Sequence, residues 1–333
     1  MRRSAFPAVL VLCCLARIGA GEESAFPDAD RVYEVLAARG IPFETNTVRR
    51  AAVEGMVRAV DPKAIVLTAA EAAVLDRQET VERAEVWAEG ICYLKIRGIY
   101  SGGGTQVTAR LRSWWEAGKA GCMMDLRGAA GDNLAEADGI AGPFVPTNAP
   151  LYDVVDGRGQ TTATHRAAED TPLAAGVPLL VLTDRETSGA AEVLAAILKG
   201  RPGVMLIGSP TSGDAAHREG VPLSEAHAFY VAVARIVPRG RASYDGAGVA
   251  PDVWVEPGAR ASVRAAFPEK KPRRKELSEK AKVDRELMEK VAGDAVLARA
   301  TDILLGLKAL GVYGTETATN APAATNAPAE DGP

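Results

Sequence analysis

The sequence has 333 residues, of which 47% are hydrophobic and 25% charged, and its formal net charge is −4. This composition is typical of a globular protein with one large domain or two modest ones. A mildly acidic chain has no general electrostatic attraction for nucleic acid, so binding of nucleic acid by that route is excluded.

Residues 1–20 have the three-part pattern of a secretory signal peptide. Arg2 and Arg3 precede the apolar run AFPAVLVLCCLA, and Gly19 and Ala20 follow it as small residues. Cleavage after Ala20 predicts a soluble exported protein, periplasmic or extracellular. Three arginines and no acidic residue leave with the signal, which changes the net charge from −4 to −7.

Two alternatives stay open for this N-terminal stretch, namely a core helix and lipid attachment through Cys13 or Cys14. No other stretch reaches about 18 uncharged apolar residues, so we expect no stable membrane span after signal removal.

Helical patterns dominate the next part of the chain. Apolar residues recur at helical spacing over 28–40, 47–60 and about 68–77. The second of these stops before Pro62, because proline disfavours helix at the residue that precedes it. We therefore predict an N-terminal helical segment over residues 25–80.

Strand-like and helical runs alternate from about residue 91 onward. The strand-like runs cover 91–98, 120–128, 177–184 and 203–208, and the helical runs cover 102–118, 133–144 and 190–200. This alternation predicts an α/β core over 85–257, with a mostly parallel sheet and flanking helices. Residues 226–240 alternate only partly, and we expect one or two strands there. Chemistry in such folds gathers at the carboxyl ends of the strands.

Two helices and a tail are predicted after the core. Residues 267–290 carry nine Lys/Arg and six Asp/Glu, which favours a solvated helix, although KKPRRK alone would suit an anionic surface. Residues 294–311 form an amphipathic pattern that ends at a capping Gly311. The helical extension thus covers 260–311, and the repeated TNAPA of 312–333 predicts disorder.

Cysteine and histidine suggest no metal or cofactor. Cys92 and Cys122 lie in strand-like runs, either as two buried thiols or as a disulfide between neighbouring strands. His165, His217 and His227 are scattered, and no stretch has metal-ligand spacing.

Several short stretches stand in a recognisable order. They read GICYLKI from residue 90, MMDLRGAAGDNL from 123, VLTDRETSGAAEVLAAILK from 181, GSPTSGD from 208 and PRGRASYDGAGVAPDVWVE from 238. Together with 51–71, they resemble segments of the carboxyl-terminal processing, or tail-specific, serine peptidases. The resemblance covers about 45–257. It implies a tail-specific protease or crotonase-like α/β core and a serine-type peptidase acting on extended peptide or protein segments.

The resemblance implies two departures from the family. Its members usually carry a PDZ domain where only the stretch 74–87 stands here, so the peptide-capturing module is expected to be missing. The family nucleophile lies three residues before a glutamate, which places it at Gly189 when counted from Glu192. The family lysine base falls on Asp214. Glycine has no nucleophile, and an aspartate with a pKa near ~3.9 is a poor base for a hydroxyl, so we predict little or no activity.

Neighbouring residues offer a fallback for the lost nucleophile. Ser188 is one place early, and that shift turns a side chain by about 100° at a helix start. We therefore interpret Thr187 or Ser188 as the helix N-cap, with Glu192 near the capping-box position. The alternative is a relocated catalytic arrangement of Ser188, His217 and Asp214.

The resemblance also places an oxyanion-hole cleft at Gly131, Asp132 and Ala190. The Asp132 carboxylate would weaken a pocket meant for developing negative charge. Asp125 and Arg127 keep the family residue types, and we interpret them as a structural ion pair or strand-end hydrogen bond.

Three functional hypotheses follow. The first is an exported pseudo-peptidase that binds a peptide or protein, and the second is an active hydrolase with a relocated nucleophile. The third is a small-ligand or lipid carrier, which the resemblance allows because a retinoid-binding relative of the fold exists. A large apolar pocket over the sheet would favour the third hypothesis.

Overall fold

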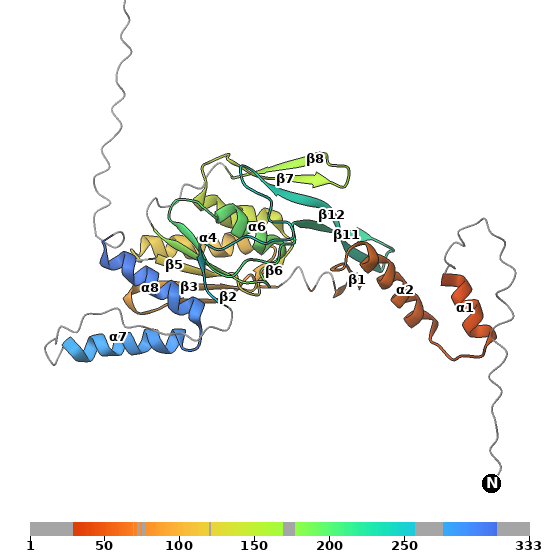
Figure 1. The fold of residues 1–333 in the computed structure, drawn as a ribbon, viewed down its shortest axis with the longest axis horizontal. Helices are drawn as coiled ribbons and strands as arrows, with labels where there is room; N and C mark the ends of the chain where they lie inside the picture. The colour runs from red at the N-terminus through yellow and green to blue at the C-terminus, as the bar shows by residue number, and fades with distance from the viewer. Residues whose placement is uncertain are drawn as a thin grey trace, which may run out of the picture. The chain divides into compact units, whose positions relative to one another are not determined.

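A computed structural model describes residues 29–68, 70–71, 74, 78–119, 121–168, 177–256 and 276–311 (Figure 1). The signal-like residues, the KKPRRK stretch and the TNAPA tail lie outside the described residues. The chain divides into two compact units, Met1–Val60 and Asp61–Pro333.

The first unit holds two helices in the stretches predicted for them. They are α1 (Ala29–Ala38) and α2 (Thr45–Val60). Glu44 caps α2, since its carboxylate accepts hydrogen bonds from the N–H groups of Asn46 and Thr47. Helix α2 ends two residues before Pro62, as proline sterics require.

The second unit is built on a six-stranded sheet in the order β13-β10-β9-β5-β3-β2. The strands are β2 (Val81–Val86), β3 (Ile91–Ile96), β5 (Gly121–Asp125), β9 (Leu179–Thr183), β10 (Val204–Gly208) and β13 (Val253–Trp254). All neighbours are parallel except β2, which runs antiparallel to β3. Strands β5 and β9 are wholly buried, which explains their continuous apolar runs.

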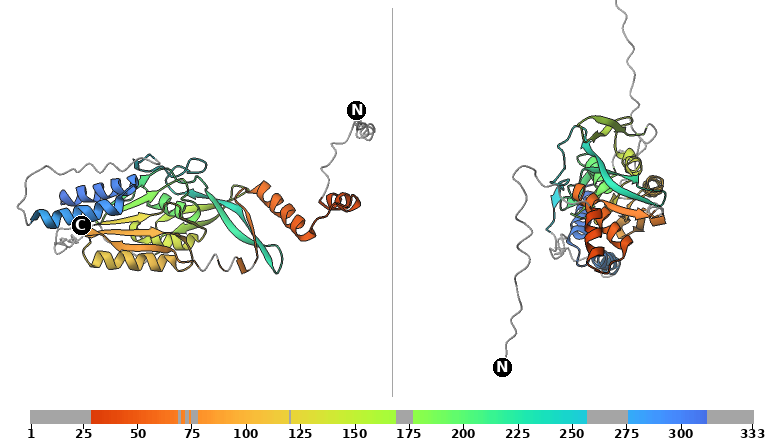
Figure 2. Two further views of the ribbon diagram at one scale, coloured as in Figure 1. Left: turned by 90° about the horizontal axis from the view of Figure 1, so that it is seen from below. Right: turned by 90° about the vertical axis from the view of Figure 1, so that its right-hand side faces the viewer.

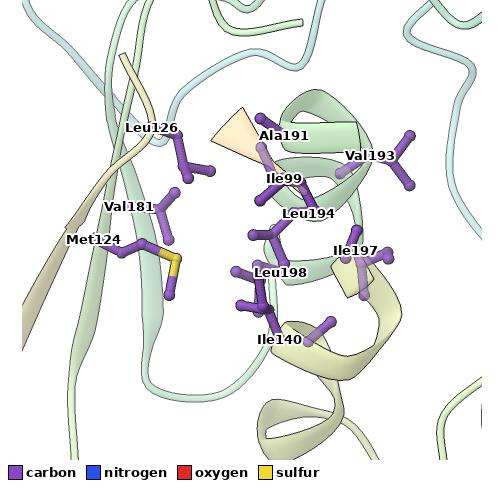
Figure 3. Close-up of a cluster of buried hydrophobic side chains, with 14 of the residues drawn as sticks. Ile99, Met124, Leu126, Ile140, Val181, Ala191, Val193, Leu194, Ile197 and Leu198 are labelled. Carbon is purple, nitrogen blue, oxygen red and sulfur yellow. The ribbon is translucent and has the colours of Figure 1, made fainter. Parts of the chain in front are cut away.

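Three helices cover one face of this sheet. They are α4 (Gly103–Glu116), α5 (Leu134–Ala141) and α6 (Gly189–Leu198). Figure 3 shows Leu194 and Leu198 of α6 pointing toward Met124 and Val181 of two neighbouring strands. Helix α6 is buried along nearly its whole length, which fixes both of its ends relative to the sheet.

The opposite face is covered by α7 (Glu276–Val291) and α8 (Ala295–Ala309) (Figure 2). Leu287 and Val291 of α7 are buried in a cluster with Met123 and Leu180 of the sheet. The charge-rich sequence therefore forms a helix whose C-terminal part joins the core, and the prediction of a fully solvated helix is wrong for that part.

A second, antiparallel sheet was not predicted. Its order is β1-β12-β7-β8, and β11 pairs with β12 as an additional strand outside this path. The strands are β1 (Ile65–Thr68), β7 (Pro150–Asp156), β8 (Thr161–Arg166), β11 (Ala216–Pro222) and β12 (His227–Pro238). Strand β1 ends at Thr68, and the described residues 70, 71 and 74 are helical, in agreement with the helix expected over about 68–77. The fold class is confirmed as α/β, with its parallel sheet joined by this antiparallel one.

A third, very short pairing completes the core. Strands β4 (Gly98–Ile99) and β6 (Ala130–Gly131) pair in parallel, with Ile99 opposite Gly131. Two 3₁₀ turns, η1 (Ala88–Gly90) and η2 (Gly142–Phe144), link neighbouring elements. The β4–β6 pair holds Gly131 against the start of α6 at Gly189.

Candidate functional site

A cavity of about 570 Å³ lies among the loops that follow the strands of the parallel sheet. It is lined by the turn Gly131–Leu134, the start of α6 at Ser188–Ala190, and the chain around Asp214 and Arg218. The first two stretches follow the carboxyl ends of β5 and β9, the usual place for a ligand in a parallel sheet. The residues predicted for the cleft from the sequence therefore converge on one cavity.

Gly189 opens α6 in a left-handed backbone conformation that a residue with a side chain adopts only under strain. Its φ is +56°, and a Cβ atom built there lies within 3.0 Å of the Gly131 carbonyl oxygen, closer than real Cβ atoms approach. Gly131 has φ +110° and is held by the backbone of Ile99 through the β4–β6 pairing. A main-chain carbonyl thus fills the space into which a nucleophile at residue 189 would project.

The predicted side-chain cap of α6 is wrong. Ser188 is the N-cap residue, with φ −144°, but its hydroxyl makes no capping hydrogen bond. Its N–H donates instead to the Ala129 carbonyl at 3.0 Å. The Thr187 hydroxyl donates to the Leu126 carbonyl at 2.9 Å, which fastens the turn to the end of β5. Tertiary partners outcompete the local cap because the turn is buried beside another strand.

Glu192 is also used differently from the capping-box prediction. Its side chain is fully buried and accepts hydrogen bonds from the Thr211 hydroxyl, the Ser212 hydroxyl at 2.9 Å, and the N–H groups of Gly213 at 2.6 Å and Asp214 at 3.0 Å. One carboxylate thus organises the whole loop after β10 and thereby positions Asp214. An acidic residue inside an apolar helix was the sequence signal for this role.

Asp214 is the centre of an ion-pair network. Its carboxylate lies 2.8 Å from Lys63 Nζ and 2.6 Å from Arg218 Nη1, and Arg218 also donates to Asp61 at 2.8 and 3.0 Å. Burial alone would raise the pKa of Asp214, but hydrogen bonds from Arg218 and Lys63 outweigh it and lower that pKa below its ordinary value. Asp214 is therefore ionised at neutral pH and already saturated with donors.

We expect this network to make stability depend on acid pH. The Arg218 hydrogen bonds lower the pKa of Asp61 as well, so both carboxylates have folded-state pKa values below their unfolded ones. Their stabilisation is present above the unfolded pKa, near ~4, and is lost as pH falls through the folded values. The double variant Asp61→Asn, Asp214→Asn should show a flatter decline of unfolding free energy below that pH in urea titrations.

The matched control for this measurement is Asp245→Asn. Asp245 is 48% exposed and lies 3.8 Å from Arg235, so its removal should leave the acid slope unchanged. An unchanged slope in the double variant would contradict a stabilising role for the network.

The fallback residues meet at the cavity without forming a catalytic chain. Ser188, His217 and Asp214 all line it, but His217 Nε2 lies 3.0 Å from Glu219 Oε1. Within the described part of the chain, no side chain hydrogen-bonds to the Ser188 hydroxyl. A relocated nucleophile stays a prediction, since no hydrogen bond among the described residues joins Ser188 to His217 or to Asp214.

The remaining cleft and supporting residues divide into two groups. Asp132 and Ala190 line the cavity beside Gly131. Asp125 and Arg127 are not among its lining residues; Arg127 Nε and Nη2 donate to the Asp125 carboxylate at 2.9 and 2.7 Å. This is the structural ion pair favoured from the sequence.

Arg127 also links the core to the C-terminal helices. Its Nη1 donates to both oxygens of Asp294, at 3.0 and 2.8 Å. The Asp294 side chain in turn caps α8 by accepting from the N–H groups of Val296 and Leu297. Arg127 therefore ties the end of β5 to the start of α8.

Cys92 and Cys122 stand opposite each other on the parallel strands β3 and β5. Both are buried and free, and burial raises the pKa of the Cys92 thiol to about 12. They are therefore two buried, unreactive thiols in this structure. Across the described residues, no cluster of three His, Cys, Asp or Glu side chains is arranged to hold a metal ion. None of the described helices is long and apolar enough to cross a membrane.

Known proteins are similar to this chain in sequence and in fold. The family model for peptidase family S41 matches residues 90–255. Carboxyl-terminal-processing peptidase 2, chloroplastic, of Arabidopsis thaliana is 29% identical over 130 residues, which are 39% of this chain and 25% of that protein. The carboxyl-terminal-processing protease of Synechocystis sp. is 27% identical over 170 residues, 50% of this chain and 38% of that one.

The chain thus spans only about a quarter to two fifths of the length of these curated relatives. A lipoprotein from Streptococcus agalactiae, 15% identical, superposes with a TM-score of 0.53 over 77% of this chain and 89% of its own, which supports the fold. Through the domain at residues 90–255, the chain is a member of peptidase family S41, the carboxyl-terminal processing serine peptidases.

Proposed function

We propose that this protein binds an extended peptide or protein segment in the cleft and does not hydrolyse it by the Ser/Lys mechanism of the family. The observation that carries the proposal is the geometry at Gly189. The position has no hydroxyl, and the Gly131 carbonyl occupies the space a serine side chain would need. A carbonyl oxygen there also presents negative charge where an oxyanion would form.

The state of the base position supports the same conclusion. Asp214 is ionised and paired, and it has no proton-accepting role toward a serine hydroxyl. Lys63 does reach the cavity, but its side chain is 53% exposed and its ammonium lies 2.8 Å from the Asp214 carboxylate. A lysine base must be a free amine, and it becomes one through burial or a like charge rather than beside a carboxylate.

The cavity walls suit a peptide segment. Ile65, Leu134 and Tyr230 supply apolar surface, while the paired charges of Asp214 and Arg218 stand at one side. Apolar walls with a few placed polar groups are the usual composition of a ligand pocket. The signal-like residues 1–20 support an exported protein, so the proposed ligand is a peptide or protein met after export.

Purified protein is expected to bind an unstructured polypeptide and leave it intact. The probe is fluorescein-labelled, reduced and carboxymethylated lactalbumin, with binding read by anisotropy and cleavage by mass spectrometry. Ala216→Trp places a large ring on the cavity wall and should weaken binding at least tenfold. The matched control Ala163→Trp lies on the exposed part of β8 and should bind normally.

Other outcomes distinguish the alternative functions. Cleavage that disappears in Ser188→Ala would overturn the proposal in favour of the relocated nucleophile, because Ser188 already lines the cavity. Binding of a lipid probe that competes with the polypeptide would favour the carrier hypothesis instead.

A further inference from the structure

A second cavity, of about 490 Å³, lies at the other end of α6. It is bounded by Ala196 in the last turn of α6, by the C-cap residue Lys199, and by residues between Pro238 and Ala250. Helix α6 has ten residues and is therefore about 15 Å long. The two cavities meet opposite ends of one buried helix and share no lining residue.

One arginine without a carboxylate in ion-pair contact among the described residues lines this second cavity, and another lies close to it. Arg241 lines it and donates from Nη1 to the Ala196 carbonyl at 2.8 Å. Arg201, nearby, donates from Nε to the Ile197 carbonyl at 3.0 Å. In the described part of the chain, no carboxylate lies within 4.0 Å of either guanidinium. Lys199 is paired with Asp252 at 2.7 Å, and Asp252 acts on Arg241 only as a charge beyond ion-pair distance.

The helix end explains only part of this arrangement. Carbonyl groups at the C-terminus of a helix carry partial negative charge, and each arginine satisfies one of them. A guanidinium has five N–H donors, and only one of the five in Arg241 has a described protein acceptor. Burial, followed by the like charge of Arg201, lowers the pKa of Arg241 and outweighs the opposing effect of the Asp252 charge.

The other walls of the cavity are apolar. Pro238, Val249 and the ring of Tyr244 contribute to the lining, and Tyr244 is 4% exposed. The Tyr244 hydroxyl is buried without a hydrogen-bond partner among the described residues. A ligand that fits this lining needs an anionic end for Arg241 and an apolar body for the walls.

We propose that the second cavity binds a molecule that carries a carboxylate on an apolar body. The planar fork of Arg241 matches a carboxylate in a bidentate manner, which favours it over a single-point contact. The apolar body packs against Ala196, Pro238 and Val249. Nothing in the Ser/Lys chemistry or in the peptide cleft assigns this site, and it lies beyond the proposed function.

Hexanoate tests this assignment directly by isothermal titration calorimetry on the full chain. Wild-type protein should bind hexanoate saturably, acetate at least tenfold more weakly, and hexylamine not at all. Arg241→Gln keeps a donor for the Ala196 carbonyl but removes the charge, and it should weaken hexanoate binding at least tenfold. The control Arg112→Gln removes the same charge from an exposed site on α4 and should leave binding unchanged.

A second variant keeps the proposal testable if Arg241→Gln does not fold. Ala242 is exposed on the cavity wall, so Ala242→Trp fills the cavity without touching the core and should abolish binding. Hexanoate that fails to bind wild type, or that binds Ala242→Trp as tightly as wild type, overturns the proposal. Polypeptide binding in the first cavity should be unaffected by Ala242→Trp, so the two proposals fail independently.

Discussion

Gly189→Ser is expected to destabilise the domain by about 2–5 kcal/mol, from left-handed backbone strain and overpacking together. It is also expected to restore no peptidase activity, even when combined with Asp214→Lys. The new Cβ would meet the Gly131 carbonyl at a distance that real structures do not show. Urea unfolding followed by tryptophan fluorescence measures the loss, and mass spectrometry of an added polypeptide measures activity.

A matched glycine separates the two causes of this loss. Gly240 has φ +68°, close to that of Gly189, but a Cβ built on it meets nothing within 4 Å. Gly240→Ala should therefore cost only about 1 kcal/mol, which is the backbone term alone. A double variant Gly189→Ser, Asp214→Lys that folds normally and cleaves would show that the loss of catalysis is purely chemical and that the turn is not fitted to glycine.

Glu192→Gln should destabilise the domain by about 3–5 kcal/mol, as expected when a buried, hydrogen-bonded carboxylate loses its charge and some partners. The carboxylate accepts from four donors in residues 211–214. A glutamine amide has one oxygen and one NH₂ group, so the NH₂ would face donors that it cannot satisfy. Equilibrium unfolding in urea gives the change in free energy.

The same substitution at an exposed helical site is the control. Glu116 lies exposed at the end of α4, and Glu116→Gln should change stability by no more than about 0.5 kcal/mol. Should Glu192→Gln prove as stable as this control, the loop after β10 would not depend on Glu192. In that case the position of Asp214 would require another explanation.

The parallel core was predictable because its strands are buried on both faces. Runs such as LLVLT in β9 are apolar throughout and stand between helical patterns. The antiparallel sheet escaped prediction because β8 and β11 are short of apolar residues and mostly exposed or half-buried. Such strands owe their structure to partners, and β1 pairs with residues 227–230 more than 150 positions away.

In the candidate site, too, features set by the local sequence were predictable, and contacts between residues distant in the sequence were not. Counting back from Glu192 placed Gly189 at the family nucleophile position, and the resemblance of residues 208–214 to the family motif placed Asp214 at the base position. The role of Glu192 was misjudged, because the local pattern Ser-x-x-x-Glu suggests a cap, while its true donors lie about twenty residues further on. The Arg218 bridge to Asp61 joins residues 157 positions apart in the sequence, and no local sequence pattern indicates such a contact.

Because α7 and α8 cover one face of the sheet, the segment that matches the family differs from the segment that the fold requires. The family match ends at residue 255, yet the sheet it describes needs residues 276–311 on one face. A chain cut back to the matched segment would leave Met123, Leu180 and Ile207 beneath no helix, and a contiguous apolar surface of this kind promotes aggregation. The smallest segment expected to fold on its own is therefore longer than the segment that matches the family. The Arg127–Asp294 ion pair joins the matched segment to the helices that follow it.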